Sequence, residues 1–310
     1  MNEPEISVSV IILNYNTKQL VLDCLASVYR TIEGLAFDVH VVDNASSDGS
    51  VPAICQKYPE VKIIENKENL GFAKANNLAL KRIKGKYALL LNSDTILMEN
   101  AVKTLYDFME HCSEAGIACG QLLNKDGSKQ NSSADFPNFL NLVINESILN
   151  VLFPRSINKC SRFQSPVVVD SCIGACILIR KKALAEVNYF DEYFFFFFEE
   201  TDLAFRMMQI GWLSYIVPEA RIYHLQGQSV GHNIKSRILF YESRYIYFKK
   251  RYGCWYILIY PLILIKLVVN IISNSVICIL SLFINAKHRK KLMVYLKLLL
   301  WHIKGCPKIK

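Results

Sequence analysis

Short apolar runs alternate with amphipathic segments along the first part of the chain. "VSVIILNYN" and "FDVHVVDNASSDGS" are rich in β-branched and aliphatic residues and then turn polar, which is typical of buried strands that end in loops. Between them, "TKQLVLDCLASVYRTI" spaces its apolar residues as a helix does, with Thr17 available as an N-cap. The alternation continues through "VKIIEN", "GFAKANNLALKRIKG", "KYALLLNSDT", "ENAVKTLYDFMEHC" and "GIACGQLL". This pattern predicts an α/β fold with a mostly parallel sheet that is covered by helices on both faces.

Polar residues collect where these predicted strands end, and such sheets bind ligands beyond the carboxyl ends of their strands. The residues at those ends are Asn14, Asn16, Asp43, Asn44, Asn69, Asn92 and Asp94. A carboxylate oxygen at Asp94 could hold Mg²⁺ or Mn²⁺ against a diphosphate. Taken alone, an aspartate after a strand more often forms a turn or caps a helix.

The middle of the chain interrupts the alternation. "NKDGSKQNSSADFPN" is rich in turn-forming residues and predicts a loop over 128–138. "VVVDSCIGACILIRKKAL" then predicts two strand segments broken at Gly174, followed by a helix that begins at Lys181. Next, "YFFFFFEETDL" sets five phenylalanines directly before Glu199 and Glu200, and a helix is predicted to follow. The phenylalanine run is too short to cross a bilayer, and on its own it could be a buried strand beside a solvated helix start.

The charge of the chain changes sign near residue 230. Up to residue 230 there are 21 lysines and arginines against 26 acids, and from residue 231 there are 15 against one. A mildly acidic body with a basic, apolar tail predicts a catalytic domain over 1–230 and a helical, membrane-associating region over 231–310. Aliphatic residues surround the lysines of the tail more than aromatic residues do, so anionic lipid is favoured and no nucleic-acid partner is predicted.

Residues 254–283 are almost all apolar, and basic clusters flank both of their ends. One crossing of a bilayer needs about 20 residues, but two basic flanks disfavour a simple crossing. The prediction is a peripheral or re-entrant helical element over 254–285 at the cytoplasmic face of the membrane, with a single span as the second choice. An ordinary core helix or an oligomer interface is the remaining alternative, and nothing in the sequence indicates the oligomeric state.

Neither the start of the chain nor its cysteines point to export. The ten cysteines are scattered without a CxxC pair, which predicts neither a zinc site nor a disulfide framework and suits a reducing cytosol. The start "MNEPEISVSVIILNYN" has acids where a secretory signal has basic residues, so no signal peptide is predicted.

Six motifs together resemble a known family. "VIILNYN", "VVDNASSDGS", "NLGFAKANN", "LLLNSDT", "GACILIRK" and "FFFFFEETDLAFR", in this order, are similar to glycosyltransferase family 2, specifically its rhamnosyltransferase-like branch, over roughly residues 6–250. The resemblance implies a GT-A fold, a nucleotide-sugar donor such as dTDP-rhamnose or a UDP-sugar, a divalent metal (Mg²⁺ or Mn²⁺), and inversion at the anomeric carbon.

The resemblance also implies roles for individual residues. The residues matching its nucleotide-sugar site are Asn14, Asn16, Asp43, Asn44, Asp48, Asn69, Gly71, Asn77 and Ser93. Asp94 matches the last acid of the DXD motif and His224 a histidine that completes the metal site, while Asn92 stands at the place of the first acid and Lys74 where many relatives have a small residue. A structural histidine is the alternative for His224.

The acidic cluster after the phenylalanines resembles the family's catalytic element. Glu200 matches the base that deprotonates the acceptor hydroxyl, although the adjacent Glu199 leaves open which of the two acts. The phenylalanines would form an apolar wall that raises the pKa of the base and excludes water. Gly174 and Asp202 match acceptor positions, with Asp202 alternatively an N-cap.

The sequence therefore predicts a metal-dependent inverting glycosyltransferase that extends a glycan or lipid-linked glycan acceptor in polysaccharide biosynthesis. A polyprenyl-phosphate sugar synthase is a second possibility. A catalytically silent assembly subunit with the same fold is a third.

Overall fold

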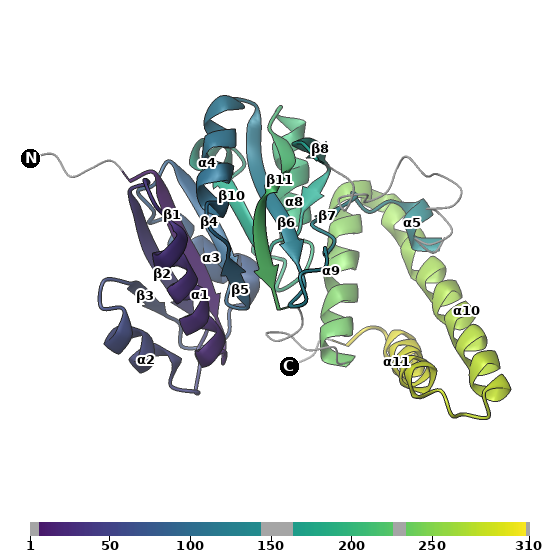
Figure 1. The fold of residues 1–310 in the computed structure, drawn as a ribbon. Coiled ribbons are helices and arrows are strands. Elements are labelled where there is room, and N and C mark those ends of the chain that lie inside the picture. The colour runs from purple at the N-terminus through teal and green to yellow at the C-terminus, as the bar shows by residue number, and fades with distance from the viewer. Residues whose placement is uncertain (1–5, 144–163, 226–233, 308–310) are drawn as a thin grey trace, which may run out of the picture. The chain divides into compact units, whose positions relative to one another are not determined.

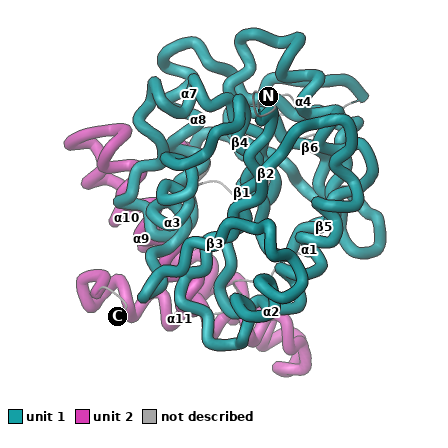
Figure 2. Tube along the Cα trace, turned by 90° about the vertical axis from the view of Figure 1, so that its left-hand side faces the viewer, with its two compact units in different colours: residues 1–136, 158–229 teal, residues 137–157, 230–310 magenta. Residues whose placement is uncertain are grey.

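The computed structural model describes residues 6–143, 164–225 and 234–307. The chain forms two compact units, which Figure 2 colours separately. The sheet unit comprises Met1–Phe136 and Asn158–Ser229, and the helical unit comprises Pro137–Ile157 and Val230–Lys310. Each unit is considered by itself below.

The sheet unit is built on a nine-stranded mixed sheet in the order β3-β2-β1-β4-β10-β6-β11-β5, with β8 paired to β11 (Figure 1). Its strands are β1 (Val8–Asn14), β2 (Phe37–Asp43), β3 (Lys62–Glu65), β4 (Tyr87–Asn92), β5 (Thr95–Leu97), β6 (Ala115–Leu123), β8 (Val167–Val169), β10 (Cys176–Arg180) and β11 (Leu213–His224). β1, β2, β3 and β4 are parallel, and β10 is inserted antiparallel between β4 and β6. A separate two-stranded sheet pairs β7 (Ser133–Ala134) with β9 (Ser171–Cys172).

Helices cover both faces of the large sheet. They are α1 (Lys18–Thr31), α2 (Ser50–Lys57), α3 (Gly71–Leu80), α4 (Ala101–His111), α7 (Lys181–Glu186) and α8 (Glu199–Gln209). Alternate side chains of a strand point to opposite faces. Accordingly, Val10 and Ile12 pack in a core with residues of α1, α2 and α4, whereas Ile11 packs in a second core with residues of α3, α7 and α8. The continuous apolar runs of the strands follow from this double burial.

Two predicted details of helix capping differ from the structure. Thr17 stands at the N-cap of α1, but its hydroxyl makes no cap hydrogen bond, and the main-chain N–H of Lys18 donates instead to Asp48 Oδ2 at 2.8 Å. The prediction that Asp202 caps the following helix is wrong. α8 begins at Glu199, after Phe198 in a left-handed conformation, so Asp202 lies within the helix.

The helical unit contains α5 (Phe139–Val143), α9 (Ile234–Tyr252), the 3₁₀ turn η2 (Gly253–Leu258), α10 (Ile259–Leu280) and α11 (Ala286–Ile303). α10 and α11 pack as an antiparallel hairpin. Tyr260 Oη near the start of α10 donates to the carbonyl of His302 near the end of α11 at 2.7 Å, and Asn274 Oδ1 lies 2.8 Å from His288 Nδ1. The two helices are therefore held together along their length.

Apolar side chains surround α10. Ile263 and Leu267 are buried against the rest of the helical unit, while Ile265, Ile272 and Ile279 are more than half exposed. A helix that is apolar on all sides belongs in a core or a membrane. Within the described residues, the helical stretch Ile234–Leu280 is long and apolar enough to cross a membrane by length and composition, with a mean hydropathy of 2.3 in its most apolar window, of which 22% is buried.

Candidate active site

The parallel register brings polar residues to one edge of the sheet. Asn14 at the end of β1 pairs with Asp43 at the end of β2, and Leu13 pairs with Asn92 at the end of β4. Ser93 follows directly. The first and fourth strands are far apart in the sequence, yet their carboxyl ends stop level with each other because parallel strands share one hydrogen-bond register.

Hydrogen bonds fix the side chains at this edge. Asn14 Nδ2 donates to Asp43 Oδ1 at 2.7 Å, and Asp43 Oδ2 accepts from the main chain of Ser46 at 2.8 Å. Thr17 Oγ1 lies 2.7 Å from Asn14 Oδ1 and 2.9 Å from Ser93 Oγ. One polar network thus joins the ends of β1, β2 and β4. Its hydrogen bonds hold these side chains in fixed positions, on which a ligand could bind.

The loops beside this edge are held by the next predicted residues. Asn16 Oδ1 accepts from the main chain of Ser47 at 2.8 Å. Asp48 accepts from the first main-chain N–H groups of both α1 and α2, at Lys18 and Ser50, so one carboxylate neutralises two helix N-termini. The contacts of Asp48 are therefore structural, whatever else it binds.

Asparagine side chains organise the loop before α3. Asn44 Nδ2 donates to Gly71 O at 3.0 Å and to Asn69 Oδ1 at 3.2 Å. Asn77 binds the main chain of Phe190: its Nδ2 donates to the Phe190 carbonyl, and its Oδ1 accepts from the Phe190 N–H. These side chains shape the loop, and their predicted contact with a nucleotide remains a prediction.

Gly71 meets the phenylalanine run. It has a φ of +77°, and a Cβ there would lie 2.3 Å from the carbonyl oxygen of Phe195. That same carbonyl accepts from the N–H of Phe72 at 2.7 Å. The loop that precedes α3 and the loop that precedes α8 are therefore in direct backbone contact, which only glycine permits.

Gly71→Ala should be markedly destabilising. A left-handed alanine costs about 1–2 kcal/mol, and the overlap with Phe195 should add about 1–3 kcal/mol. The matched control is Gly127→Ala, since Gly127 has a φ of +81° but nothing within 4 Å of its Cβ position. Urea unfolding of both variants separates the cost of a left-handed alanine from the cost of the overlap with Phe195. Equal losses of unfolding free energy would show that the contact with Phe195 contributes nothing.

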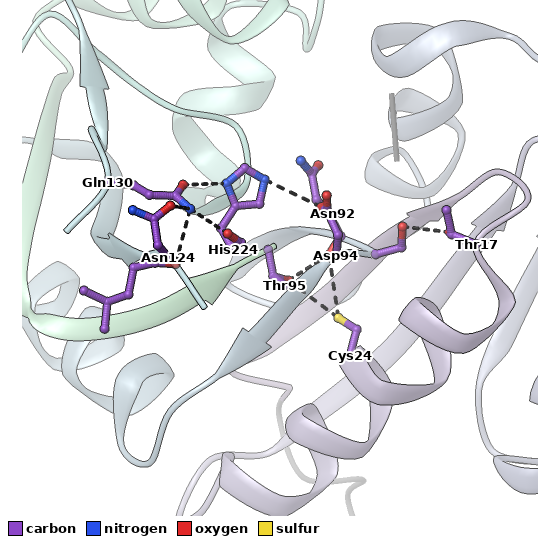
Figure 3. A network of polar contacts seen from close by, with 10 residues as sticks. Thr17, Cys24, Asn92, Asp94, Thr95, Asn124, Gln130 and His224 are labelled. Carbon is purple, nitrogen blue, oxygen red and sulfur yellow. Dashed lines mark hydrogen bonds and ion pairs between the residues drawn. The ribbon is translucent and has the colours of Figure 1, made fainter. Parts of the chain in front are cut away.

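Asp94 and His224 lie side by side (Figure 3). The antiparallel pairing of β5 with β11 sets His224 opposite Thr95, and the N–H of Leu225 donates to Asp94 O at 2.9 Å. Both side chains are buried, and His224 Nε2 lies 3.6 Å from Asp94 Oδ1. Burial lowers the pKa of His224 from its ordinary value, and the Asp94 carboxylate opposes this shift.

This pair fits a divalent cation. A carboxylate oxygen and an imidazole nitrogen are both ligands for Mn²⁺, and 3.6 Å is too long for a strong hydrogen bond but open to two ligands of one ion. Within the part of the chain that the structure describes, no cluster of three or more His, Cys, Asp or Glu residues could hold a metal. A cation at Asp94 and His224 would therefore need oxygen ligands from substrate or water, as is usual for Mg²⁺.

Gln130 orients His224, and the sequence analysis did not select it. Its Oε1 lies 3.0 Å from His224 Nδ1 and its Nε2 donates to His224 O at 2.6 Å. It belongs to the predicted loop over 128–138, which contains β7. Only a general expectation that metal-binding histidines have a second partner could have pointed to such a residue.

The acidic cluster reaches the same edge of the sheet through β10. Cys176 pairs with Leu91, and the N–H of Asn92 donates to Ala175 O at 2.9 Å, so Gly174 lies across from the end of β4. Gly174 is beside Glu200, since a Cβ there would be 3.7 Å from the Glu200 carboxyl carbon. That is an ordinary contact, so an alanine would also fit. Glu200 therefore lies beside the turn that faces the end of β4.

The two glutamates have different environments. Glu199 is only 4% exposed, whereas Glu200 is partly exposed. Burial, together with the neighbouring Glu200 carboxylate, raises the pKa of Glu199 well above its ordinary value. Burial also raises the pKa of Glu200, and a backbone hydrogen bond from Gly174 opposes the shift. The two environments push the pKa values of these carboxyl groups apart. This difference favours Glu200 as the ionised member of the pair and Glu199 as the neutral one.

Asp202 and the phenylalanine run complete the acidic segment, and the acceptor contact predicted for Asp202 stays a prediction. Asp202 is buried and accepts from Arg206 Nε at 2.7 Å, and Arg206 Nη2 donates to Tyr189 O at 2.7 Å. In the phenylalanine run, Phe194 is fully buried, while Phe195 is 43% exposed. The run is therefore partly a core element and partly an apolar surface.

Residues 9–187, more than half of the chain, match the model of the family described as Glycosyl transferase family 2. The chain belongs to glycosyl transferase family 2. The resemblance stated from the motifs and the predicted enzyme class are confirmed: this family-2 protein is a rhamnosyltransferase-like glycosyltransferase.

Two relatives are rhamnosyltransferases. The family-2 chain is 27% identical over 235 residues to the N-acetylglucosaminyl-diphospho-decaprenol L-rhamnosyltransferase of Mycobacterium tuberculosis, covering 70% of this chain and 76% of the relative. It is 29% identical over 185 residues to rhamnosyltransferase WbbL of Escherichia coli, covering 55% and 66%.

Two solved structures share the fold. The mannosyltransferase PcManGT from Pyrobaculum calidifontis, in complex with GDP-Man and Mn²⁺, is 15% identical with a TM-score of 0.59, covering 95% of this chain and 87% of that one. GalNAc-T7 with UDP, GalNAc and Mn²⁺ is 14% identical with a TM-score of 0.55, covering 81% and 51%. The predicted GT-A fold with a long apolar C-terminal helix is confirmed.

Proposed function

We propose that the protein transfers a sugar, with rhamnose from dTDP-rhamnose as the first candidate, to a hydroxyl group of a lipid-linked glycan with inversion at the anomeric carbon. The two rhamnosyltransferase relatives support the donor, and the decaprenol-linked substrate in the name of one of them supports the acceptor class. A UDP-sugar donor is the second candidate.

The observation that carries this proposal is the placement of Asp94 and Glu200 at the same edge of the sheet. Asp94 lies in the turn after β4, beside His224, and the pairing of β10 with β4 brings Glu200 to the same edge through Gly174. A donor diphosphate and an acceptor hydroxyl have to be held at such neighbouring positions for direct displacement.

In the proposed reaction Glu200 accepts the proton of the acceptor hydroxyl. The acceptor oxygen forms the new bond to the anomeric carbon while the bond from that carbon to the diphosphate oxygen breaks, and the nucleoside diphosphate leaves with the electron pair. The raised pKa of Glu200 makes its carboxylate a stronger base than an exposed glutamate. The exposed ring of Phe195 and its neighbours would keep water, the competing acceptor, from the donor.

Asp94 and His224 would hold Mg²⁺ or Mn²⁺. When bound, the ion neutralises charge on the diphosphate. The nucleotide would bind against Asn14, Asp43 and Ser93, because hydrogen bonds among these residues and Thr17 hold the ends of three strands in place.

A polyprenyl-phosphate sugar synthase is the second candidate function. Its acceptor is already ionised and needs no base, so a glutamate with a raised pKa at this edge favours a hydroxyl acceptor. The third candidate, a silent assembly subunit, would bind no donor.

The deciding assay offers dTDP-rhamnose or a UDP-sugar to the full chain, with Mn²⁺ or with a chelator. The acceptor is either a lipid-linked N-acetylglucosamine or polyprenyl phosphate. We expect metal-dependent transfer from dTDP-rhamnose to the glycan lipid, with an inverted linkage by NMR. Transfer to polyprenyl phosphate alone would establish the synthase, and no binding of any nucleotide would establish the silent subunit.

We also propose that residues 231–310 attach the protein to the cytoplasmic face of an anionic membrane. α10 has 22 residues, which at 1.5 Å each measure about 33 Å, close to the thickness of a bilayer core. Its exposed isoleucines and the basic residues at the start of α11 together suit acyl chains and anionic headgroups.

The full chain should therefore float with vesicles that contain anionic lipid. Replacing Ile272 and Ile279 together by aspartate should release it, because both apolar side chains are exposed on α10. Ile210→Asp is the matched control, since Ile210 is similarly exposed but lies in the sheet unit. Flotation that is insensitive to the α10 pair would contradict attachment through this helix.

A further inference from the structure

Gln130 is held rigidly on the segment that follows β6. Its main-chain N–H donates to Leu122 O at 2.8 Å, and its carbonyl accepts from Gln121 Nε2 at 2.7 Å. The side chain is 9% exposed. Backbone and side chain are thus fixed before any ligand arrives.

The contacts of the Gln130 amide identify its two ends. Nε2 lies 2.6 Å from His224 O, 2.8 Å from Asn124 Oδ1 and 3.3 Å from Leu123 O. Two of these partners are main-chain carbonyls, which can only accept hydrogen bonds. The NH₂ group must therefore occupy this position, and the amide oxygen must occupy the other.

The amide oxygen then determines the tautomer of His224. Gln130 Oε1 lies 3.0 Å from His224 Nδ1, and an amide oxygen can only accept, so Nδ1 has to carry a hydrogen (Figure 3). In the neutral ring the hydrogen is then absent from Nε2, and the Nε2 lone pair faces Asp94 Oδ1 at 3.6 Å. Two electron-rich atoms facing each other at this separation favour a cation between them.

We infer that Gln130 is a positioning residue that holds His224 in the Nδ1-protonated tautomer, so that the Nε2 lone pair and the Asp94 carboxylate are presented to one divalent cation. This inference rests on the proposed metal dependence. Gln130 contacts His224 twice, at the ring and at the main-chain carbonyl, so it fixes both the orientation of the ring and its tautomer. Without it, the hydrogen could move to Nε2 and His224 could pair with Asp94, closing the site to metal.

The first test is the tautomer of His224 in the metal-free protein, read by ¹⁵N NMR of histidine-labelled full chain. Wild type should show a protonated Nδ1, and Gln130→Met, which keeps the length but removes the acceptor, should shift His224 towards the Nε2-protonated form. Gln19→Met is the matched control, because Gln19 is an exposed glutamine on α1 whose Nε2 donates to Asp23 Oδ1. A protonated Nε2 in wild type, or the same spectrum in Gln130→Met, would overturn the inference.

The second test is Mn²⁺ affinity in the presence of nucleoside diphosphate. Partners of metal-binding histidines change affinity by about 10–100-fold, so Gln130→Met should bind Mn²⁺ that much more weakly, whereas Gln19→Met should bind it as wild type does. Thermal unfolding confirms that each variant is folded. Wild-type affinity in Gln130→Met would refute the metal-positioning role, whereas no Mn²⁺ binding in wild type would refute the proposed metal dependence and leave the NMR result to decide the role of Gln130.

Discussion

Replacing Glu200 by glutamine should lower kcat for sugar transfer by about 10²–10⁴-fold, while the affinity for nucleoside diphosphate stays unchanged. Glutamine keeps the volume and one hydrogen-bonding oxygen beside Gly174 but cannot take a proton. Single-turnover kinetics measure the chemical step, and calorimetry with Mn²⁺ measures nucleotide binding. An equal loss in the rate of the chemical step and in nucleotide affinity would mean that Glu200 supports the donor site and is not the base.

Glu199→Gln is the matched control for this substitution. Glu199 is buried and its pKa is raised well above the ordinary value, so it holds a proton more readily than Glu200 and is less suited to act as the base, and the loss should be less than about tenfold. The reverse ranking would assign the base to Glu199. In wild type the rate should fall as the pH drops through the raised pKa of Glu200, because the base acts only when deprotonated. The residual activity of Glu200→Gln should lack this acidic limb.

Asp94→Asn should abolish Mn²⁺-dependent nucleotide binding and lower kcat/KM by about 10²–10⁴-fold, since a bound metal contributes several kcal/mol to charge stabilisation. Asparagine preserves the shape at the end of β4 but removes the negative charge beside His224. Calorimetry with and without Mn²⁺ gives the binding result directly.

Asp107→Asn controls for the loss of one acid. Asp107 is a half-exposed residue on α4 that pairs with Lys103. Its variant should bind nucleotide and metal as wild type does. Metal-dependent binding that survives in Asp94→Asn would place the ion elsewhere and remove the main support for the proposed site.

The sheet could be predicted from the sequence because its strands are buried on both faces. Continuous apolar runs mark such strands, and the residue at which each run turns polar marks its end, so Asn14, Asp43 and Asp94 could be placed at one edge of the sheet before the structure was known. The motifs then identified the family. Local signals were sufficient because parallel strands end level.

Contacts between distant segments could not be predicted in this way. Gln130 and His224 are 94 residues apart, and nothing in a turn-rich loop distinguishes a glutamine that orients a histidine from one that faces solvent. The start of α8 was misplaced because the left-handed Phe198 carries no glycine or asparagine signal. The role of Gly71 against Phe195 likewise depends on where another loop returns.

The antiparallel insertion of β10 between β4 and β6 has a consequence for how such enzymes can diversify. The separation between Asp94 and Gly174 is set by hydrogen bonds across two adjacent strands, so the chain between Ala134 and Val167 can vary in length without changing that separation. A one-residue slip of β10, in contrast, would turn each of its side chains to the opposite face. Natural variants with new acceptors should accordingly carry insertions and deletions in that intervening chain, while the lengths of β4 and β10 stay constant.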